Sequence, residues 1–233
     1  MRKAVFAIAG LVSLLWVSAA AAARQPVVVE LYTAQGCSSC ASADRLLGQL
    51  AARKGVLALT FAVDYWDYLG WSDTFARPEF TARQRAYMQK MGAREVYTPQ
   101  LVIDGKQQAS GANPARVEAL LKQALRAPRD APQMTARRGR VAVGGGRVPA
   151  GGGEVWLVRY DPDDQAVTVK RGENRGQTVT QKNVVRQLVL LGTWRGKPRL
   201  FPLPASPSPD LKAVVLVQAA KGGRVITASQ PKS

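Results

Sequence analysis

Histidine is absent from the sequence, and cysteine occurs only twice, at Cys37 and Cys40. Without histidine, the chain cannot form a Ser-His-Asp triad, a Cys-His protease dyad or a histidine-ligated zinc, haem or copper site. A single cysteine pair cannot complete a tetrahedral zinc site either. These absences exclude much common hydrolytic and metal chemistry and direct attention to the cysteine pair.

Acidic residues are scarce, since 16 Asp and Glu stand against 33 Lys and Arg for a net charge of +17. The basic residues are scattered along the chain rather than clustered, so a nucleic-acid partner is not predicted. Weak attraction to anionic envelope surfaces or acidic partners is one interpretation of this charge. A merely solvated basic surface is the simpler one.

Long apolar runs are missing except at the N-terminus. There, Arg2 and Lys3 precede an apolar stretch over residues 4–17, and small residues follow up to Ala23. This pattern is typical of a secretory signal peptide, because the apolar stretch is shorter than the roughly 20 residues that span a bilayer. We expect residues 1–23 to be cleaved rather than kept as an anchor, which lowers the net charge from +17 to +15 and leaves a periplasmic or secreted protein without a stable membrane anchor. Export exposes the chain to oxidising conditions, in which a lone cysteine pair forms a disulfide.

The first part of the mature chain, residues 24–128, predicts an α/β domain. Apolar β-branched runs alternate with segments in which apolar residues recur at helical spacing. The predicted order of elements is β-α-β-α-β-β-α, beginning with a right-handed parallel crossover. The expected elements are a strand at 27–31, a helix at 38–54, a strand at 56–64, a helix at 78–91, a hairpin at 99–108 that turns at Asp104-Gly105, and a helix from residue 113.

The remaining residues, 129–233, predict a smaller all-β, sandwich-like domain that follows a proline-containing linker at residues 127–133. Short β-rich runs such as "EVWLVRY", "AVTVKR" and "AVVLVQA" are separated by loops rich in glycine or proline. The stretch "GGGRVPAGGG" lacks the Gly-Lys-Ser/Thr ending of a phosphate-binding loop and does not open a helix. We interpret it as a hairpin loop.

The sequence "GCSSC" at residues 36–40 allows three interpretations. As a redox pair, Cys37 is the nucleophile and Cys40 the resolving thiol, because a helix N-terminus favours the Cys37 thiolate and one helical turn brings Cys40 within reach. As a structural disulfide, the pair closes a loop of about four residues and contributes roughly 2 kcal/mol, which is little for a chain of this length. As a metal site, two thiolates could hold Cu(I), but no further ligands complete the site. The redox interpretation is preferred.

The predicted order of elements resembles the thioredoxin fold, in which a cis-proline loop lies opposite the CxxC pair. Thr98-Pro99 stands immediately before the "QLVIDG" strand and matches that loop. The resemblance implies a cis peptide bond and backbone groups that bind a substrate peptide. An ordinary trans-proline at the start of a strand is the alternative.

Glu30 is a lone carboxylate that closes an apolar strand run, seven residues before Cys37. The thioredoxin fold places a buried acid in a similar position, where it takes a proton from the resolving thiol. The resemblance implies this role for Glu30, although the spacing is one residue longer than in thioredoxin. A glutamate that faces solvent at the strand edge is the alternative.

The loop "DYWDYLGWSD" at residues 64–73 follows the second predicted strand. It should emerge at the carboxyl ends of the parallel strands, where open α/β sheets place their sites, and therefore border the CxxC pair. Its aromatic residues could form a contact surface for a partner, and its aspartates could fix the loop or tune the thiols. A hydrophobic plug with capping aspartates is an equal alternative. The residues concerned are Tyr65, Trp66, Tyr68, Trp71, Asp64 and Asp67.

Several stretches together resemble domain of unknown function family 1223, a group of exported bacterial thioredoxin-like proteins. They are "VVVELYTAQGCSSC", "VDYWDYLGW", "RQRAY", "VYTPQLVIDG", "RGENRGQT" and "NVVR". Two prolines usually follow the second cysteine in this family, whereas Ala41 and Ser42 stand here, and Ala62 replaces a histidine that usually precedes "VDYWD". The resemblance implies two domains, one thioredoxin-like and one β-rich. We interpret "RGENRGQT" as a structured turn or domain contact rather than a partner-binding segment.

Two functional hypotheses follow from the sequence. The first is an exported thiol-disulfide oxidoreductase that exchanges disulfides with a protein partner through a mixed disulfide at Cys37. The second is a non-catalytic envelope binding protein in which the Cys37–Cys40 disulfide stays closed. No haem or flavin motif is present, so no cofactor is predicted.

Overall fold

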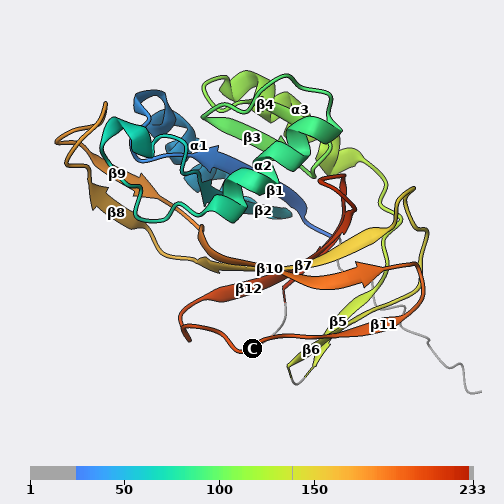
Figure 1. Cartoon of the computed structure of the whole chain (residues 1–233). Coiled ribbons are helices and arrows are strands. Elements are labelled where there is room, and N and C mark those ends of the chain that lie inside the picture. Colours follow the sequence, from blue (N-terminus) through green and yellow to red (C-terminus); the bar gives the residue numbers. More distant parts are fainter. Residues whose placement is uncertain (1–24, 138, 231–233) are drawn as a thin grey trace, which may run out of the picture.

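The computed structural model describes residues 25–137 and 139–230, so the predicted signal peptide at residues 1–23 lies outside the described residues. Figure 1 shows helices gathered at one end of the molecule and a β-rich region at the other. Within the described ranges, none of the helices combines the length and apolar character that crossing a bilayer requires. The helices are α1 (Ala41–Ala51), α2 (Pro78–Lys90) and α3 (Pro114–Arg126), with 3-10 turns η1 (Ser38–Cys40) and η2 (Asp67–Leu69).

The remaining regular elements of the described residues are strands. The strands of the N-terminal half are β1 (Val27–Thr33), β2 (Val56–Ala62), β3 (Gln100–Ile103) and β4 (Gln107–Ser110). Those of the C-terminal half are β5 (Met134–Arg137), β6 (Arg140–Val143), β7 (Gly153–Asp161), β8 (Gln165–Thr168), β9 (Thr178–Gln181), β10 (Val184–Trp194), β11 (Arg199–Pro202), β12 (Lys212–Ala219) and β13 (Val225–Ser229).

One mixed sheet of eight strands, in the order β13-β12-β7-β10-β2-β1-β3-β4, organises the molecule. Strands β1 and β2 are parallel and joined through α1, whereas β3 pairs antiparallel with β1 and with β4. The α/β prediction is confirmed, and from β1 to α3 the regular elements follow the expected order. The predicted hairpin turns at Asp104 and Gly105, both of which have positive φ angles, as tight hairpin turns require.

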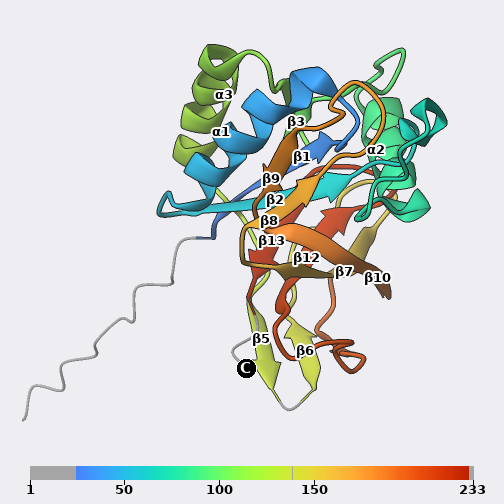
Figure 2. The same cartoon turned by 90° about the vertical axis from the view of Figure 1, so that its left-hand side faces the viewer.

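Strand β1 is buried along its whole length because helices cover both faces of the sheet there. Successive side chains of a strand point to opposite faces. Val27, Val29 and Leu31 therefore pack in the cluster that includes α1 and α3, whereas Val28 and Tyr32 pack in the cluster that includes α2. Figure 2 shows α1 and α3 on one side of these strands and α2 on the other.

The C-terminal half consists of strands and turns, as predicted, but it does not form a separate sheet. Strands β7, β10, β12 and β13 extend the eight-stranded sheet, and β5, β6 and β11 form a second sheet. Apolar side chains of the two sheets pack together as in a sandwich, around the buried residues Val141, Leu157, Trp194, Phe201 and Val217. The predicted boundary near residue 128 thus divides strands that share one sheet, and the division into two domains stays a prediction from the sequence.

The two halves join where β10 lies parallel to β2. Val184 pairs with Thr60, and the Thr60 amide donates to the Asn183 carbonyl at 3.0 Å. The Asn183 side-chain amide donates to the Ala58 carbonyl at 2.8 Å. The "NVVR" stretch therefore connects the C-terminal half to β2, the strand of the N-terminal half that borders it in the sheet.

Candidate functional site

The cysteine pair lies where β1 ends and the first helical turn begins. Cys37 and Cys40 form a disulfide with Cα atoms 5.4 Å apart. The Cys40 amide donates to the Cys37 carbonyl at 3.1 Å, which closes the turn that precedes α1. The exposed fractions of the two residues are 0% and 1%, so the disulfide is covered by the rest of the protein.

The Thr98–Pro99 loop lies against the disulfide. Its peptide bond is cis, as expected. The Thr98 hydroxyl lies 3.4 Å from the Cys37 Sγ and donates toward it, and the Trp66 indole N–H donates to the same hydroxyl oxygen at 2.8 Å. The Thr98 hydroxyl can therefore donate to sulfur while its oxygen accepts from Trp66. A hydrogen-bond donor at this position stabilises a thiolate.

The aromatic loop borders the cysteine pair, as the sequence predicted, and Gln35 connects the two. The Gln35 backbone amide donates to the Asp73 carboxylate at 2.6 Å, and the Trp71 indole donates to the Gln35 side-chain carbonyl at 3.0 Å. Asp67 in turn accepts the Asp73 backbone amide at 3.1 Å, and Asp64 accepts the hydroxyl of Thr81 in α2 at 2.6 Å. The predicted aspartates therefore hold the loop in place.

The aromatic side chains of this loop differ in exposure. Tyr65 and Trp66 pack against the hydrophobic cluster that contains both cysteines, and burial raises the pKa of Tyr65 to about 12. Tyr68 is 80% exposed. The hydrophobic-plug interpretation thus describes Tyr65 and Trp66. A contact with a partner through Tyr68 stays a prediction.

Glu30 is buried, as the resemblance implied, but its contacts differ from the expected ones. Its carboxylate forms a bidentate ion pair with Arg83 of α2, with both N–O distances 2.8 Å, and accepts the hydroxyls of Tyr32 and Tyr87 at 2.8 Å. Burial alone would lower the pKa of Arg83, but the charge of Glu30 raises it well above its usual value. Both Glu30 oxygens are occupied, so the expected proton transfer with Cys40 finds no support in these contacts. The strand alternation directs this side chain to the α2 face of the sheet.

A second buried acid, Asp44, was not predicted. It lies on α1 four residues after Cys40, on the same helical face, and is 3% exposed. Neither of its carboxylate oxygens forms a hydrogen bond of normal geometry with a described residue. Burial raises the pKa of Asp44 to about 7, although the neighbouring Thr33 hydroxyl and Gln181 amide act in the opposite direction. The group therefore exchanges a proton near neutral pH.

The "RGENRGQT" stretch contacts the backbone on both sides of Cys37. It forms the cap loop, which we define as residues 171–177, between β8 and β9 (Figure 1). The Asn174 side-chain amide donates to the backbone carbonyls of Gln35 and Cys37 at 2.8 and 3.0 Å. Glu173 accepts the Ser38 amide and hydroxyl at 3.1 and 2.7 Å, and these bonds lower the pKa of Glu173. The stretch is thus a structured contact between the two halves, in agreement with the preferred interpretation of its sequence.

Asp44, Glu173 and Asn174 were not predicted as site residues. The sequence around Asp44 contains a signal that could have identified it, whereas the other two are harder to find. Asp44 could have been found, because a carboxylate on the buried stripe of a helix, one turn after a cysteine, is unusual. Glu173 and Asn174 lie in the "RGENRGQT" stretch that carries the family resemblance, but no local pattern placed that stretch beside the cysteine pair, because about 135 residues separate the two. Among the residues that the structure describes, no group of three or more Cys, Asp or Glu side chains is arranged to hold a metal ion.

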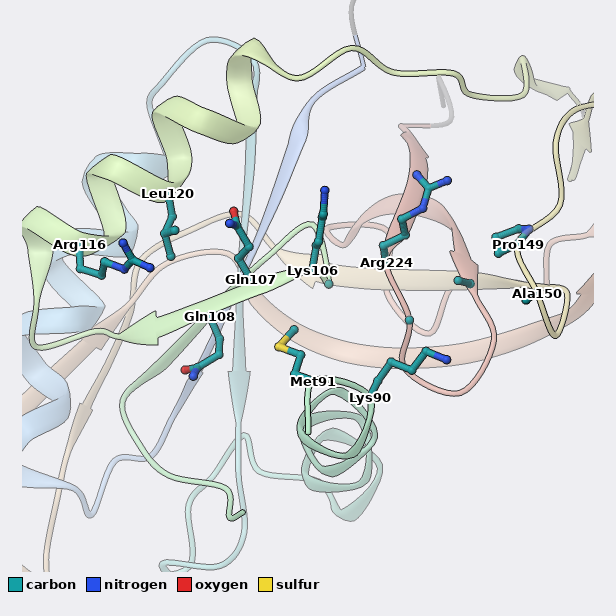
Figure 3. A pocket seen from close by; sticks show the side chains of 13 residues that line it. Lys90, Met91, Lys106, Gln107, Gln108, Arg116, Leu120, Pro149, Ala150 and Arg224 are labelled. Carbon is teal, nitrogen blue, oxygen red and sulfur yellow. The ribbon is translucent and has the colours of Figure 1, made fainter. Parts of the chain in front are cut away.

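A cavity of about 650 Å³ opens elsewhere, where α2, α3 and the β3–β4 and β12–β13 turns meet (Figure 3). Lys90, Lys106, Arg116 and Arg224 contribute to its lining, together with the apolar Met91 and Leu120. Neither cysteine lines it, and neither does any residue of the aromatic loop. This basic cavity is therefore separate from the candidate redox site.

Fold and site together define a mixed α/β protein with a covered CxxC disulfide. The chain belongs to the family described as "Protein of unknown function (DUF1223)", whose profile matches residues 28–218. It is similar to the crystal structure of protein AGR_C_4864 from Agrobacterium tumefaciens, with 32% identity, coverage of 88% of this chain and 93% of that chain, and a TM-score of 0.69. HBP35 of Porphyromonas gingivalis shares the fold, with 12% identity, coverage of 89% and 74%, and a TM-score of 0.60. No curated protein matches the sequence.

Proposed function

We propose that the protein is an exported, thioredoxin-like thiol-disulfide oxidoreductase that exchanges disulfides with a protein partner through Cys37. The observation that carries this proposal is the Thr98 hydroxyl directed at the Cys37 Sγ from the cis-proline loop, at 3.4 Å. A structural disulfide has no need of a hydrogen-bond donor aimed at one of its sulfurs. A nucleophilic sulfur uses such a donor to hold its negative charge.

The proposed exchange transfers two electrons between a partner dithiol and the cysteine pair. A partner thiolate attacks the Cys37 Sγ, the Cys37–Cys40 bond breaks, and Cys40 leaves as a thiolate that takes a proton. A second partner thiolate then attacks the partner sulfur of the mixed disulfide, which releases Cys37 as a thiolate and leaves the partner with a disulfide. The same steps run in reverse when the protein is the reductant and the partner disulfide is reduced.

Asp44 is the acid that best fits the proton transfer at Cys40. It lies one helical turn from Cys40, is buried, and exchanges a proton near neutral pH. Glu30 has its oxygens committed to Arg83 and two tyrosines. The order of elements from β1 to α3 supports the thioredoxin-like assignment, and the signal-peptide pattern supports a periplasmic or secreted location.

One observation favours the second function, a non-catalytic envelope binding protein. The cysteines are 0% and 1% exposed, so a partner thiolate has no approach to the Cys37 Sγ in this arrangement. Under the first function the surroundings must open to admit a partner. Under the second function the disulfide stays closed, and the exposed Tyr68 region is the working surface.

The reduction potential of the cysteine pair separates the two functions. We expect equilibration against glutathione, read by mass, to give a value between about −120 and −270 mV, the range of known exchange catalysts. A value below about −300 mV is typical of structural disulfides and would favour the binding protein.

A trapping experiment tests the exchange step directly. Cys40→Ser should accumulate a mixed disulfide with a peptide that carries one activated disulfide, because no resolving thiol remains. Cys37→Ser is the matched control, and it should accumulate far less adduct because Cys40 is the resolving thiol. Equal labelling of the two variants would contradict the assignment of Cys37 as the nucleophile.

A further inference from the structure

The cap loop is fastened on both sides of its contact with the cysteine pair. On its own side, the Val169 amide donates to the Gln177 carbonyl at 2.9 Å, and the Gly176 amide donates to the Val169 carbonyl at 2.8 Å. On the opposite side, a Cβ atom added to Gly172 would lie 3.8 Å from the Leu69 Cβ atom and 4.0 Å from the Gly36 Cα atom, so the loop runs close to both segments. The loop thus has a defined conformation against the redox pair.

Asn174 is the buried attachment point of the cap loop. It is 7% exposed, and its side-chain amide donates to the carbonyls of Gln35 and Cys37. These two carbonyls belong to the loop that leads into the first helical turn, and the Cys37 carbonyl also accepts the Cys40 amide of that turn. The side chain of Asn174 therefore adds hydrogen bonds to the backbone of the loop that carries Cys37.

Glu173 places a negative charge beside Cys37. The amide that it accepts, from Ser38, is one of the unpaired N–H groups at the start of the helical turn. Such groups stabilise the thiolate of a cysteine at a helix N-terminus. In this protein a carboxylate occupies the Ser38 amide and the Ser38 hydroxyl, so the positive end of the helix is partly neutralised.

We propose that Glu173 and Asn174 belong to the redox site, where Asn174 is a positioning residue that holds the cap loop and Glu173 shifts the pair toward the disulfide by opposing the Cys37 thiolate. This inference deepens the proposed function and rests on it for its biological meaning. It assigns to the C-terminal half a direct effect on the chemistry of the N-terminal half. It also makes the cap loop responsible for covering the disulfide.

The relevant reaction is the reduction of the pair by glutathione. Two glutathione thiols are oxidised to one glutathione disulfide, and the Cys37–Cys40 bond is reduced to two thiols. A negative charge near Cys37 raises the free energy of the dithiol form, in which Cys37 carries thiolate character, and leaves the neutral disulfide unaffected. Because Glu173 is exposed, the effect should weaken at high salt.

The test compares reduction equilibria of the full mature protein and its variants. Glu173→Gln keeps the size of the side chain and a carbonyl acceptor but removes the charge. We expect the equilibrium constant for reduction by glutathione to rise about tenfold, which corresponds to about 30 mV for a two-electron couple. The difference from wild type should shrink in 1 M salt. Glu118→Gln, on α3, removes an equal charge that pairs with Arg53 beyond the C-terminal end of α1, the end opposite the cysteine pair, and should give the wild-type value.

A double-mutant cycle tests the positioning role of Asn174. If Asn174 acts by holding Glu173 in place, Asn174→Ala should shift the equilibrium in the same direction, and combining it with Glu173→Gln should add little. Asn174→Ala should also speed reduction by dithiothreitol, because the cover over Cys37 is released. Additive shifts would overturn the positioning role.

Different measurements test the role of Glu173 and the oxidoreductase activity. A shift for Glu173→Gln no larger than that for Glu118→Gln, with circular dichroism showing both variants folded, would overturn the inference even if Cys40→Ser traps the peptide. Conversely, a Glu173 effect on the potential without trapping by Cys40→Ser would leave the electrostatic inference standing and contradict the oxidoreductase.

Discussion

Asp44 and Glu30 are both buried carboxyl groups, but their surroundings give them different properties. Glu30 is fully paired with Arg83 and two tyrosine hydroxyls. Asp44 lacks a hydrogen bond of normal geometry within the described part of the chain, and burial raises its pKa to about 7. An unpaired buried acid is costly when ionised, so its retention one turn from Cys40 is consistent with a task in proton transfer.

We predict that Asp44 makes the stability of the protein depend on pH. The pKa of Asp44 is about 7 in the folded protein and 3.8 in the unfolded chain, so the folded state binds this proton more tightly. The contribution is fully present below about pH 4 and is lost as the pH rises to about 7, by up to about 4 kcal/mol. Urea unfolding at several pH values should show this loss in wild type and a smaller one in Asp44→Asn.

The exposed Asp163 provides the control for this measurement. Asp163→Asn should follow the wild-type stability curve across the same pH range. Parallel curves for wild type and Asp44→Asn would show that Asp44 does not titrate between the two states, and they would remove the basis for its proposed exchange of a proton with Cys40.

Among the structural elements, the turn between β12 and β13 has an unusually close contact with α2 and the β3–β4 turn. Val225 donates its amide to the Asp104 carbonyl at 2.7 Å. A Cβ atom on Gly222 would lie 2.4 Å from the Ala86 carbonyl carbon, and one on Gly105 would lie 2.7 Å from the Gly223 carbonyl oxygen. Glycine at these positions allows the C-terminal half to pack directly on backbone atoms of the N-terminal half.

We predict that Gly222→Ala destabilises the protein more than Gly92→Ala. Both glycines have left-handed φ angles, +70° and +68°, but a Cβ atom on Gly92 meets no atom within 4 Å. Gly92→Ala should therefore cost about 1 kcal/mol from backbone strain alone. Gly222→Ala should cost about 2 kcal/mol more, because the backbone of α2 must move. Urea denaturation measures both values, and equal losses would argue against the close contact.

At the scale of the whole molecule, one hydrophobic cluster contains residues from both sides of the predicted domain boundary near residue 128. Tyr32, Phe61 and Phe80 of the N-terminal half pack in the same cluster as Val158 and Leu216 of the C-terminal half. Polar contacts also cross between the halves. The linker residue Arg129 forms an ion pair with Asp104 in the β3–β4 turn at 2.6 Å. The Arg83 side chain of α2 donates to the Gln218 side-chain carbonyl of β12 at 2.9 Å. Separating the halves would expose apolar surface and break buried polar contacts.

We predict that both halves unfold together in a single transition. Pulse-labelling hydrogen exchange read by mass, with the disulfide intact, should give peptides from residues 25–128 and 139–230 the same urea midpoint. The physical reason is that neither half covers its share of the eight-stranded sheet alone. Two midpoints separated by more than about 1 M urea would show that the predicted domains fold independently.

The sequence by itself determined the local elements and the identity of the cysteine pair. Periodic apolar residues, glycine stops and the Asp104-Gly105 turn depend on neighbours in the chain, and the helices at 41–51, 78–90 and 114–126 lie within the expected segments. The cis peptide at Pro99 and the loop of Trp66 and Trp71 beside the cysteines followed from the resemblance and the strand order. The lack of histidine also narrowed the possible chemistry, because composition alone excludes every mechanism that needs an imidazole.

Only the tertiary structure decided which distant groups meet. The Glu30 side chain meets Arg83 because the α2 helix covers that face of β1. Glu173 and Asn174 meet the cysteine loop because the β8–β9 hairpin packs against a segment about 135 residues earlier in the chain. The joining of the C-terminal strands to β2 rests on a few hydrogen bonds near Asn183. Such contacts arise from the packing of whole elements, whereas sequence patterns report mainly on residues within a few turns of one another.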